Sequence, residues 1–490
     1  MTGASSADAS APGAPLDKVL AELASGFAAH RAALAEFVAI PSVSTDPAHA
    51  GDVARAADWV AARLRAAGPL EVERVETGGH PAVLASWDGA PGAPTVLVYG
   101  HMDVQPPDPL DAWHSDPFTL TERDGRWYAR GISDDKGSML IPILVAEAFF
   151  RHGTPPLNLR FLFEAEEEVG SPHLPELVRE RAAALACDVV LSADGGMWRA
   201  DLPSITTSAR GMTGLELRVR GPAKDLHSGR HGGAVHNPLH ALAELVAGLH
   251  DAEGRVTVDG FYDGVEAPIA ERLAELDALP FDDDAYLAET GAPATYGEAG
   301  YGTLARQWLR PTLEINGVGG GYQGPGSKTV LPSTGFAKIT CRLVAGQDPA
   351  RVADAIEAHL RAHAPAGVHV DVVRSELGAD AYQVRDGHPA LDAAEAVLDE
   401  VLGAHPVRVG MGGSVPITAT FRDVLNADTL FFSFSTADED IHAPNEFYRP
   451  ERFRAGMQAW ARLWARLAED GARTTSAAPG GADADAGAEP

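Results

Sequence analysis

Short apolar runs alternate with longer amphipathic stretches along most of the chain. The apolar runs are rich in β-branched residues, which predicts strands; they lie at residues 82–87, 95–99, 157–165 and 188–194. Helical spacing of Ala and Leu predicts helices at residues 16–38 and 53–66, and residues 138–150 are apolar nearly all round, as in a buried helix. This alternation predicts an α/β fold with a mainly parallel sheet flanked by helices.

The pattern changes near residue 207. Residues 211–221 alternate apolar and polar positions, which predicts a strand with one exposed face. The elements predicted after it are a helix at 237–249, strands at 312–316 and 336–344, a helix at 349–363 and a strand at 368–374. This β-α-β-β-α-β order is typical of an α+β domain with a four-stranded sheet and two helices. A long insert, about 252–310, separates its first helix from its second strand.

After about residue 386 the first pattern resumes, with a helix at 389–403, a strand at 429–435 and a helix at 451–468. A chain of 490 residues is too long for one ordinary hydrophobic core. We therefore expect a first domain formed by residues 15–206 plus 386–470, interrupted by a second domain, residues 207–385. Residues 1–14 and 471–490 are rich in Ala, Gly, Ser and Pro, which predicts disordered tails.

Composition narrows the classes of partner. The formal net charge of −30 disfavours binding to nucleic acid or to an anionic membrane. The chain has no run of apolar residues long enough to span a membrane and no secretory signal at its start, so we expect a cytoplasmic protein. Two cysteines, Cys187 and Cys341, do not make a disulfide framework, and a reducing compartment fits them.

Acidic and histidine side chains stand at or just past the ends of five apolar runs. Parallel strands that lie side by side deliver such side chains to one edge of a sheet, where ligands bind in open α/β folds. The residues are His101 and Asp103 after the run 95–99, Asp134 and Asp135 in GISDDKG, Glu166, Glu167 and Glu168 after the run 157–165, Asp194 after the run 188–194, and His442 after the run 429–435.

So many like charges at one edge are costly unless a divalent metal compensates them. Imidazole and carboxylate ligands suit Zn²⁺ and, with more carboxylate, Mn²⁺. Two ions that share one carboxylate would activate a bridging water. Each residue alone has an ordinary explanation, such as a helix N-cap for an Asp or a solvated charge run for the three Glu. The five groups together favour a metal site.

At these residues the chain resembles a family of zinc aminopeptidase-like co-catalytic metallopeptidases. The family includes glutamate carboxypeptidase, aminoacylase, succinyl-diaminopimelate desuccinylase and carnosine dipeptidase. The resemblance covers about residues 16–468, and the stretch 310–333 together with the long insert resembles the dipeptidase branch. The motifs that carry it are YGHMDVQP (99–106), W-x3-PF (113–118), DGRWYARGISDDKG (124–137), EEEVGS (166–171), DLHSGRHGG (225–233), RPTLEINGVGGGYQGPGSKTVLPS (310–333) and GGSVPIT (412–418).

The resemblance implies a catalytic first domain that binds two ions. One ion would be bound by His101 and Asp194, the other by Glu168 and His442, with Asp134 bridging both. Glu167 would be the general base and Asp103 would orient His101. Glu166 makes the run one Glu longer than the family needs, so the register of base and ligand stays open at this point.

The resemblance also implies a lid or dimerisation role for the second domain. His227 would reach the active site of the partner subunit in a homodimer and stabilise the oxyanion. Arg342 and Thr329 would meet the C-terminal carboxylate of the substrate. Gly413 and Ser414 would present backbone and hydroxyl donors to the peptide. Relatives often carry a charged residue just before GGS, where this chain has Met411 and Gly412, so the specificity for substrate side chains is not fixed.

The expected function is hydrolysis of dipeptides or short peptides by a water activated by two divalent ions, Zn²⁺ or Mn²⁺, with Glu167 as general base. The alternative enzyme is an N-acyl-amino-acid amidohydrolase or a desuccinylase of the same family. The alternative outside the enzymes is a catalytically dead homologue that only binds metal. A dead homologue is expected to lack the base or a ligand, and this chain has all of them.

Overall fold

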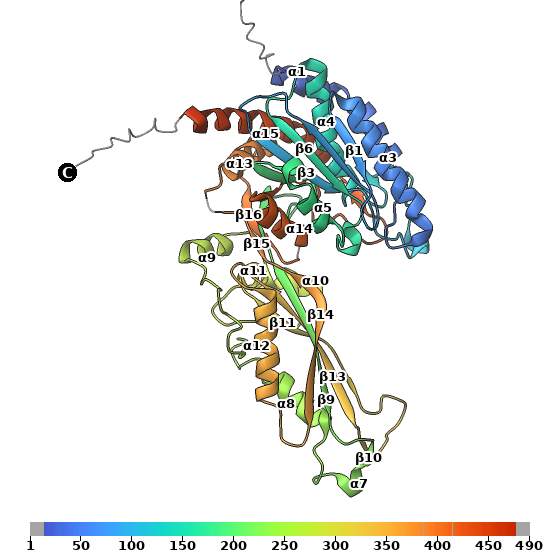
Figure 1. The fold of residues 1–490 in the computed structure, drawn as a ribbon, viewed down its shortest axis with the longest axis vertical. Coiled ribbons are helices and arrows are strands. Elements are labelled where there is room, and N and C mark those ends of the chain that lie inside the picture. Colours follow the sequence, from blue (N-terminus) through green and yellow to red (C-terminus); the bar gives the residue numbers. More distant parts are fainter. Residues whose placement is uncertain (1–13, 386, 414, 477–490) are drawn as a thin grey trace, which may run out of the picture. The chain divides into compact units, whose positions relative to one another are not determined.

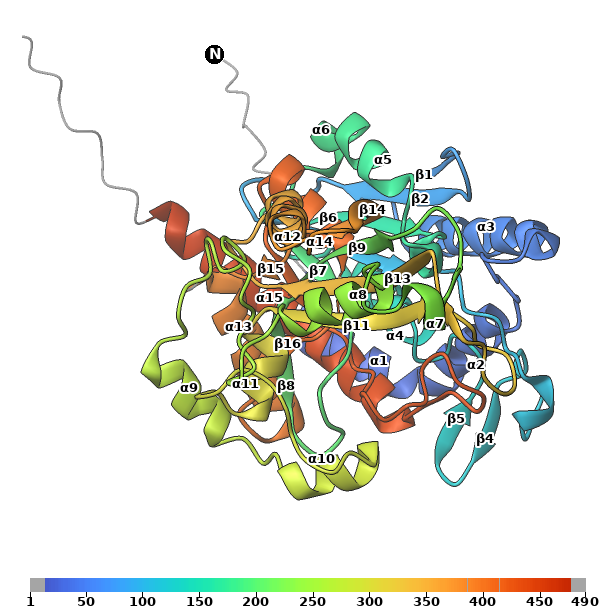
Figure 2. The ribbon, with the colours of Figure 1, turned by 90° about the horizontal axis from the view of Figure 1, so that it is seen from below.

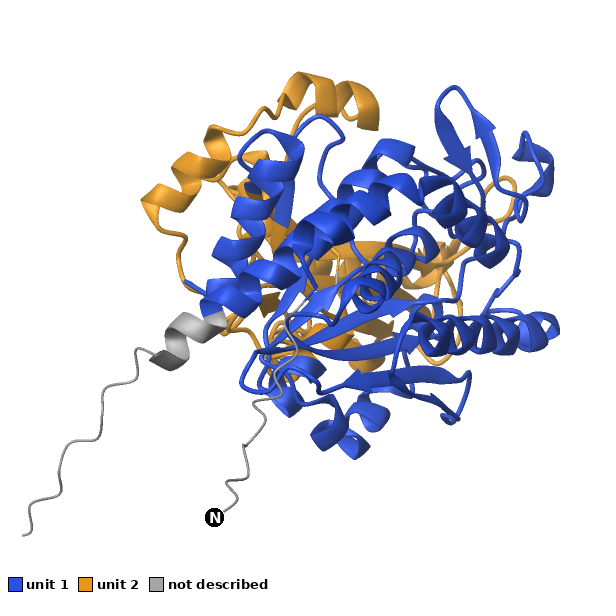
Figure 3. Cartoon of the chain, turned by 90° about the horizontal axis from the view of Figure 1, so that it is seen from above, with its two compact units in different colours: residues 1–205, 385–407, 420–490 blue, residues 206–384, 408–419 orange. Residues whose placement is uncertain are grey.

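The computed structural model describes residues 14–385, 387–413 and 415–476, and these form two compact units (Figure 3). Unit 1 comprises the described residues of 1–205, 385–407 and 420–490, and unit 2 comprises those of 206–384 and 408–419. The segment 408–419 groups with unit 2, whereas the hydrophobic pattern assigned it to the first domain. Ser414 lies outside the described residues.

Five strands of the sheet of unit 1 lie in apolar runs expected as strands, and a further strand at its edge, residues 71–75, was not expected (Figure 1). In the order in which they pair, its strands are β1 (Glu71–Val75), β2 (Ala82–Trp87), β6 (Asn158–Glu164), β3 (Thr95–His101), β7 (Val189–Ser192) and β17 (Thr429–Phe431). β3 is parallel to both β6 and β7, and β17 is parallel to β7. β1 and β2 form an antiparallel edge. The mainly parallel α/β sheet expected from the sequence is thereby confirmed.

Helices flank this sheet because each buries an apolar face. They are α1 (Leu16–Ser25), α2 (Phe27–Val38), α3 (Ala50–Ala67), α4 (Lys136–His152), α5 (Leu174–Glu180), α6 (Ala182–Leu185), α13 (Pro389–Leu402) and α15 (Pro450–Ser476). α4 is buried nearly all round and packs against β3, α1, α3 and α15. The single helix expected at 16–38 is divided at Gly26. None of the described helices is long and apolar enough to cross a lipid bilayer.

The last helix of unit 1 extends beyond the end that the sequence predicted. α15 extends to Ser476, so residues 471–476 are helical although the sequence predicted a tail from residue 471. Residues 1–13 and 477–490 lie outside the described residues. Unit 1 also contains a small antiparallel sheet of β4 (Thr121–Arg123), β5 (Arg126–Tyr128) and β18 (Phe447–Tyr448).

Unit 2 has the β-α-β-β-α-β order that the sequence predicted (Figures 1 and 2). Its elements are β9 (Gly211–Arg220), α8 (Pro238–Ala247), β11 (Thr312–Gly320), β13 (Thr334–Leu343), α12 (Pro349–Ala362) and β14 (His369–Ala379). The sheet is antiparallel with strand order β11-β13-β9-β14. Alternate residues of β9 and β13, such as Leu217 and Ile339, form one core with Leu242 of α8 and Ile356 of α12.

Smaller elements complete unit 2. The long insert carries α9 (Ala270–Asp277), α10 (Asp283–Thr290) and α11 (Thr303–Trp308). β10 (Leu226–His227) and β12 (Val330–Leu331) form a two-stranded sheet. Along the chain, α7 (Ser228–His231) follows β10, and β13 follows β12. β8 (Ser204–Ala209) pairs with β15 (Tyr382–Gln383) and β16 (Val407–Met411), and α14 spans Pro416–Thr420.

Candidate metal centre

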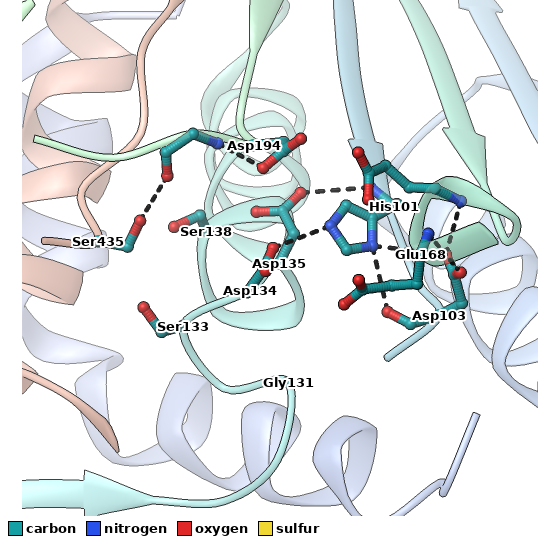
Figure 4. Close-up of polar contacts among 12 residues, drawn as sticks. His101, Asp103, Gly131, Ser133, Asp134, Asp135, Ser138, Glu168, Asp194 and Ser435 are labelled. Atoms are coloured by element: carbon teal, nitrogen blue, oxygen red, sulfur yellow. Dashed lines mark hydrogen bonds and ion pairs between the residues drawn. The ribbon is translucent and has the colours of Figure 1, made fainter. Parts of the chain in front are cut away.

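Three parallel strands of unit 1 end at the same edge of the sheet. β3 ends at His101, which is paired with Glu164 at the end of β6, and Tyr99 of β3 is paired with Ser192 at the end of β7. The loops that follow these strands carry the acidic residues of the motifs. The positions at which the strands end therefore bring His101, the EEEVGS loop and Asp194 into one region (Figure 4).

Two groups of three side chains in this region can each hold a metal ion. His101, Asp134 and Asp194 form the first triplet, and Asp134, Glu168 and His442 form the second; within each triplet the ligand atoms lie within 4.8 Å of one another. The Nε2 atom of His101 is 3.0 Å from Oδ1 of Asp134, and Nε2 of His442 is 2.9 Å from Oδ2. Asp134 thus presents a different oxygen to each triplet.

The electrostatics of the cluster reflect its crowded carboxyl groups. Burial, together with the charge of neighbouring carboxylates, raises the pKa of Asp194 to about 6. Burial likewise raises the pKa of Glu167 well above its usual value, with further contributions from Asp194, Asp134 and Glu168 that outweigh the opposite effect of His101. When no cation is present, such groups hold their protons to a higher pH than an exposed carboxyl group does.

The pKa values of the two imidazoles are raised as well, because neighbouring carboxylates stabilise their protonated, charged forms. Burial disfavours the protonated form of His101, but hydrogen bonds to Asp103 and Asp134 outweigh it and raise its pKa well above 6.5. Hydrogen bonds to Asp134 and Glu168 raise the pKa of His442 to about 10. Burial of Asp134 is outweighed by hydrogen bonds to both imidazoles, which hold its pKa well below the usual range. These shifts favour a proton on each imidazole, so a cation bound at the same atoms would compete with protons.

These residues fit divalent metal by their chemistry and their placement. Imidazole nitrogen and carboxylate oxygen are donors that Zn²⁺ and Mn²⁺ accept. Both Nε2 atoms are directed at Asp134, and the side chain of His101 is completely buried. Buried carboxylates this close to one another are costly unless positive charge compensates them. The residues that the sequence assigned to metal binding are thus brought together in unit 1.

Asp103 connects His101 to the loop after β6. Its side chain is fully buried and accepts hydrogen bonds from Ser44 Oγ (2.7 Å) and from the backbone N–H groups of Glu167 and Glu168 (3.3 and 3.1 Å). The Nδ1 atom of His101 is 3.1 Å from the Asp103 backbone oxygen and 3.4 Å from its Oδ1. Asp103 thus contacts both the ring of His101 and the EEEVGS loop, and its expected role in orienting that ring stays a prediction.

The position of Glu166 bears on the register of the Glu run. Its carboxylate accepts a hydrogen bond from the backbone N–H of His80 (3.1 Å), and it lies 2.9 Å from Nδ1 of His173. Glu168, by contrast, lies 3.2 Å from Nε2 of His442. Glu166 is therefore occupied in contacts outside the two triplets, and Glu168 is the member of the Glu run that belongs to the second triplet.

Sequence reasoning missed several polar residues around this centre. Gln105 donates from Nε2 to Oε2 of Glu168 (2.8 Å). Glu446 is fully buried and accepts hydrogen bonds from the turn that carries Asp134. Gln105 lies within the YGHMDVQP motif, and Glu446 follows His442 by four residues. The only sequence signal for Gln105 and Glu446 is that each lies four residues after a predicted metal ligand, His101 or His442.

The residues assigned to the second domain occupy two places in unit 2. His227 of β10 is exposed and pairs with Val330 of β12, and the N–H of Ser228 donates to the carbonyl oxygen of Thr329 (3.1 Å). His227 and Thr329 are thus neighbours near the start of β13. Arg342 lies close to the opposite end of β13.

A second arginine, not found from the sequence, lies near Arg342. The backbone N–H of Arg210 donates to the carbonyl oxygen of Gly413 (3.1 Å), and its Nε donates to that of Gly412 (3.1 Å). Burial, together with the positive charge of Arg342, lowers the pKa of Arg210 to about 10. Arg342 and Arg210 therefore form a positively charged group that Glu314 partly offsets, and the carbonyl groups of Gly412 and Gly413 lie beside it.

The raised pKa of His442 leads to a prediction for metal binding by the metal-free protein. Below about pH 10 this ring holds a proton that a metal ion must displace, so affinity falls as pH is lowered. We expect the affinity for Mn²⁺ to rise between about pH 6 and pH 8, by up to about tenfold per pH unit for each proton displaced. Calorimetric titration in two buffers of different ionisation enthalpy counts those protons. His442→Ala should release fewer of them, and an affinity independent of pH would contradict the prediction.

Comparison with known proteins agrees with this geometry. The model of Peptidase family M20/M25/M40 matches residues 97–466. The Cys-Gly metallodipeptidase of Saccharomyces cerevisiae is 32% identical, over 87% of this chain and 93% of the yeast protein. The cysteinylglycine-S-conjugate dipeptidase of Corynebacterium striatum is 30% identical, over 85% of this chain and 90% of its own. The crystal structure of human carnosine dipeptidase 1 superposes with a TM-score of 0.73 at 28% identity, covering 94% of this chain and 100% of the human one. The family resemblance seen in the motifs is confirmed: the chain belongs to Peptidase family M20/M25/M40 and is a metallopeptidase.

Proposed function

We propose that this metallopeptidase hydrolyses dipeptides with two divalent ions, zinc or manganese, bound at the two triplets of unit 1. The observation that carries the proposal is Asp134, whose two oxygens face different imidazoles and so belong to both triplets. The names of the relatives support the substrate class, since those of yeast and Corynebacterium striatum are both dipeptidases of cysteinylglycine compounds.

In the proposed reaction His101, Asp194, Glu168 and His442 would hold the ions, and Asp134 would contribute to both metal positions. When bound, the ions would polarise the scissile carbonyl group and lower the pKa of the attacking water. Glu167 takes a proton from that water and returns it to the leaving amine, so that a peptide and water yield a carboxylate and an amine. The half-buried position of Glu167, among Asp194, Asp134 and Glu168, gives it the high proton affinity that a base needs.

The positively charged group in unit 2 supports the proposed recognition of the substrate. Arg342 and Arg210 would bind the C-terminal carboxylate of the dipeptide. Gly413 would present a backbone donor to the peptide, and the hydroxyl donor expected from Ser414 belongs to a residue outside the described ones. Two guanidinium groups near each other favour an anion over a neutral ligand, which suits a substrate with a free C-terminus. The preferred side chain of the substrate stays open, because this chain has Met411 and Gly412 where relatives often carry a charged residue.

We also propose that the protein is a homodimer formed through unit 2. Thr329 and Arg342 stand near opposite ends of β13, and the strand between them spans about 25–30 Å at roughly 3.3 Å per residue. A dipeptide is too short to contact both residues of one chain. His227 and Thr329 would therefore act on the substrate held by a second copy.

A reducing compartment such as the cytoplasm is proposed on the basis of the two free cysteines.

A panel of substrates tests the reaction class. We expect the metal-loaded protein to hydrolyse Cys-Gly and β-Ala-His, the dipeptides in the names of relatives, faster than N-acetyl amino acids or succinyl-diaminopimelate. Activity should disappear with a chelator and return with Zn²⁺ or Mn²⁺, measured as release of free amino acid. Turnover of the acylated substrates alone would support the amidohydrolase alternative. No turnover of any substrate would support the metal-binding homologue without catalysis.

Glu167→Gln tests the base. Removal of the proton acceptor should lower kcat by about 10²–10⁴-fold while leaving metal stoichiometry unchanged, because Glu167 is not among the proposed ligands. Glu166→Gln is the matched control in the same Glu run, and we expect it to change kcat by less than about tenfold, since Glu166 contacts His80 and His173 instead. Full activity of Glu167→Gln would exclude this mechanism.

Mixed subunits test the proposed dimer. His227→Ala and Glu167→Gln should each be nearly inactive alone. If His227 acts on the partner's site, random exchange gives mixed dimers in which one site has both native residues, so the mixture should regain up to about one quarter of native activity. If His227 acted within its own chain, every site of the mixture would lack one residue and no activity would return. Dimer formation is checked independently by light scattering.

A further inference from the structure

One buried ion pair lies among the loops that carry the proposed metal ligands. Nη1 of Arg130 donates to Oε2 of Glu446 (2.7 Å), and the two side chains are each only 1% exposed. Arg130 precedes the turn with Asp134, and Glu446 follows the loop with His442. Asp134 and His442, which form the second triplet with Glu168, are therefore each four residues along the chain from a member of this ion pair.

The carboxylate of Glu446 holds the turn that presents Asp134. Its Oε2 atom accepts the N–H of Gly131 (2.8 Å), and its Oε1 atom accepts those of Ser133 (2.8 Å) and Asp134 (3.2 Å). Together with the guanidinium of Arg130, these donors satisfy both oxygens of a buried charge, as burial requires. No shorter acidic side chain at this position would reach the same donors without backbone movement.

The guanidinium of Arg130 connects the remaining loops. Its Nη2 atom donates to the carbonyl oxygen of Pro106 and to that of Ala443, each at 3.2 Å. Pro106 is the last residue of the YGHMDVQP motif, which contains His101, and Ala443 is adjacent to His442. Through Arg130 and Glu446, segments that are more than 300 residues apart in the sequence are held at fixed positions.

The loop with His442 needs such support because of its backbone conformation. Asp440, His442 and Asn445 have φ values of 51°, 64° and 67°, in the left-handed region that residues with a side chain adopt uncommonly, Asp, His and Asn more often than others. The loop is held on its outer side by Asn445, which accepts a hydrogen bond from the N–H of His114 (2.9 Å) and donates to the carbonyl oxygen of Ala112 (2.8 Å). On its inner side Glu446 is the anchor.

We propose that Glu446 and Arg130 are positioning residues that set the affinity for divalent metal by fixing the placement of Asp134 and His442. This inference rests on the proposed function, in which Asp134 and His442 bind the ions. Neither residue of the pair would touch substrate. Their loss should weaken metal binding while leaving the catalytic step unaffected once both metal positions are filled.

Calorimetric titration of the metal-free full-length protein with Mn²⁺ tests the proposal without any substrate. Glu446→Gln removes the charge and one acceptor oxygen, and Glu446→Asp keeps the charge but shortens its reach. For both variants we expect the dissociation constant of the weaker ion to rise by about tenfold or more. If only Glu446→Gln is weakened and Glu446→Asp binds as the native protein does, charge alone is responsible and the positioning role is wrong.

Asp428→Asn is the matched control. Asp428 is also a fully buried carboxylate of unit 1 paired with an arginine, since Nε of Arg385 lies 2.5 Å from its Oδ2, but it is not part of the loops with the ligands. This variant should unfold at a lower temperature and bind Mn²⁺ within about twofold of the native protein. An equal loss of affinity in Asp428→Asn and Glu446→Gln would show a general effect of lost stability and overturn the proposal.

A kinetic readout separates positioning from catalysis. At saturating Mn²⁺ we expect Glu446→Gln to regain kcat within about threefold of the native value with KM unchanged, although it is much less active at limiting metal. A kcat that stays low at saturating metal would contradict the inference.

If Glu446→Gln does not fold, Asn445→Ala loosens the same loop from its solvent side and should also raise the dissociation constant for Mn²⁺. Unchanged binding in that variant overturns the proposal. Native protein that binds fewer than two ions would instead refute the proposed function.

Discussion

Repulsion among carboxylates is the constraint on which this structure depends. The ends of β3, β6 and β7 gather acidic side chains in a buried region where each negative charge raises the proton affinity of its neighbours. The shared carboxylate of Asp134 remains charged because two imidazoles surround it, whereas Asp194 and Glu167 are pushed toward their protonated forms. Divalent cations and protons therefore compete for the same set of atoms, and the surrounding hydrogen bonds decide how well the cations compete.

Much of the fold is encoded in local patterns. Apolar runs such as 95–99 are strands because their residues are buried on both faces, and the alternation in 211–221 marks a strand with one exposed face. The order of elements then limits the topology of both units, so the parallel sheet and the four-stranded antiparallel sheet follow. Finer features escape this reasoning. The break of the first helix depends on the single residue Gly26, and nothing in the pattern of residues 408–419 shows that they group with unit 2.

The metal centre was predictable to a similar degree. Ligands that stand at strand ends can be found because the strand itself is visible in the sequence, and His101 and Asp194 are found in this way. Glu446 and Arg130 cannot, since a charged residue in a loop has the same local pattern whether it is solvated or buried against a partner 316 positions away. The separation of Thr329 from Arg342 depends on the direction of β13 and is likewise invisible in the motifs that contain them.

The insertion of unit 2 has a consequence for the order in which the centre is completed during synthesis. His101, Asp134 and Asp194 all precede unit 2 in the chain, whereas His442 and Glu446 follow it. A nascent chain therefore has the first triplet long before the second, and the turn with Asp134 lacks its anchor until the last segment of unit 1 emerges. In the interval unit 2 can fold, because the strands and helices of its core belong to one continuous stretch of the polypeptide.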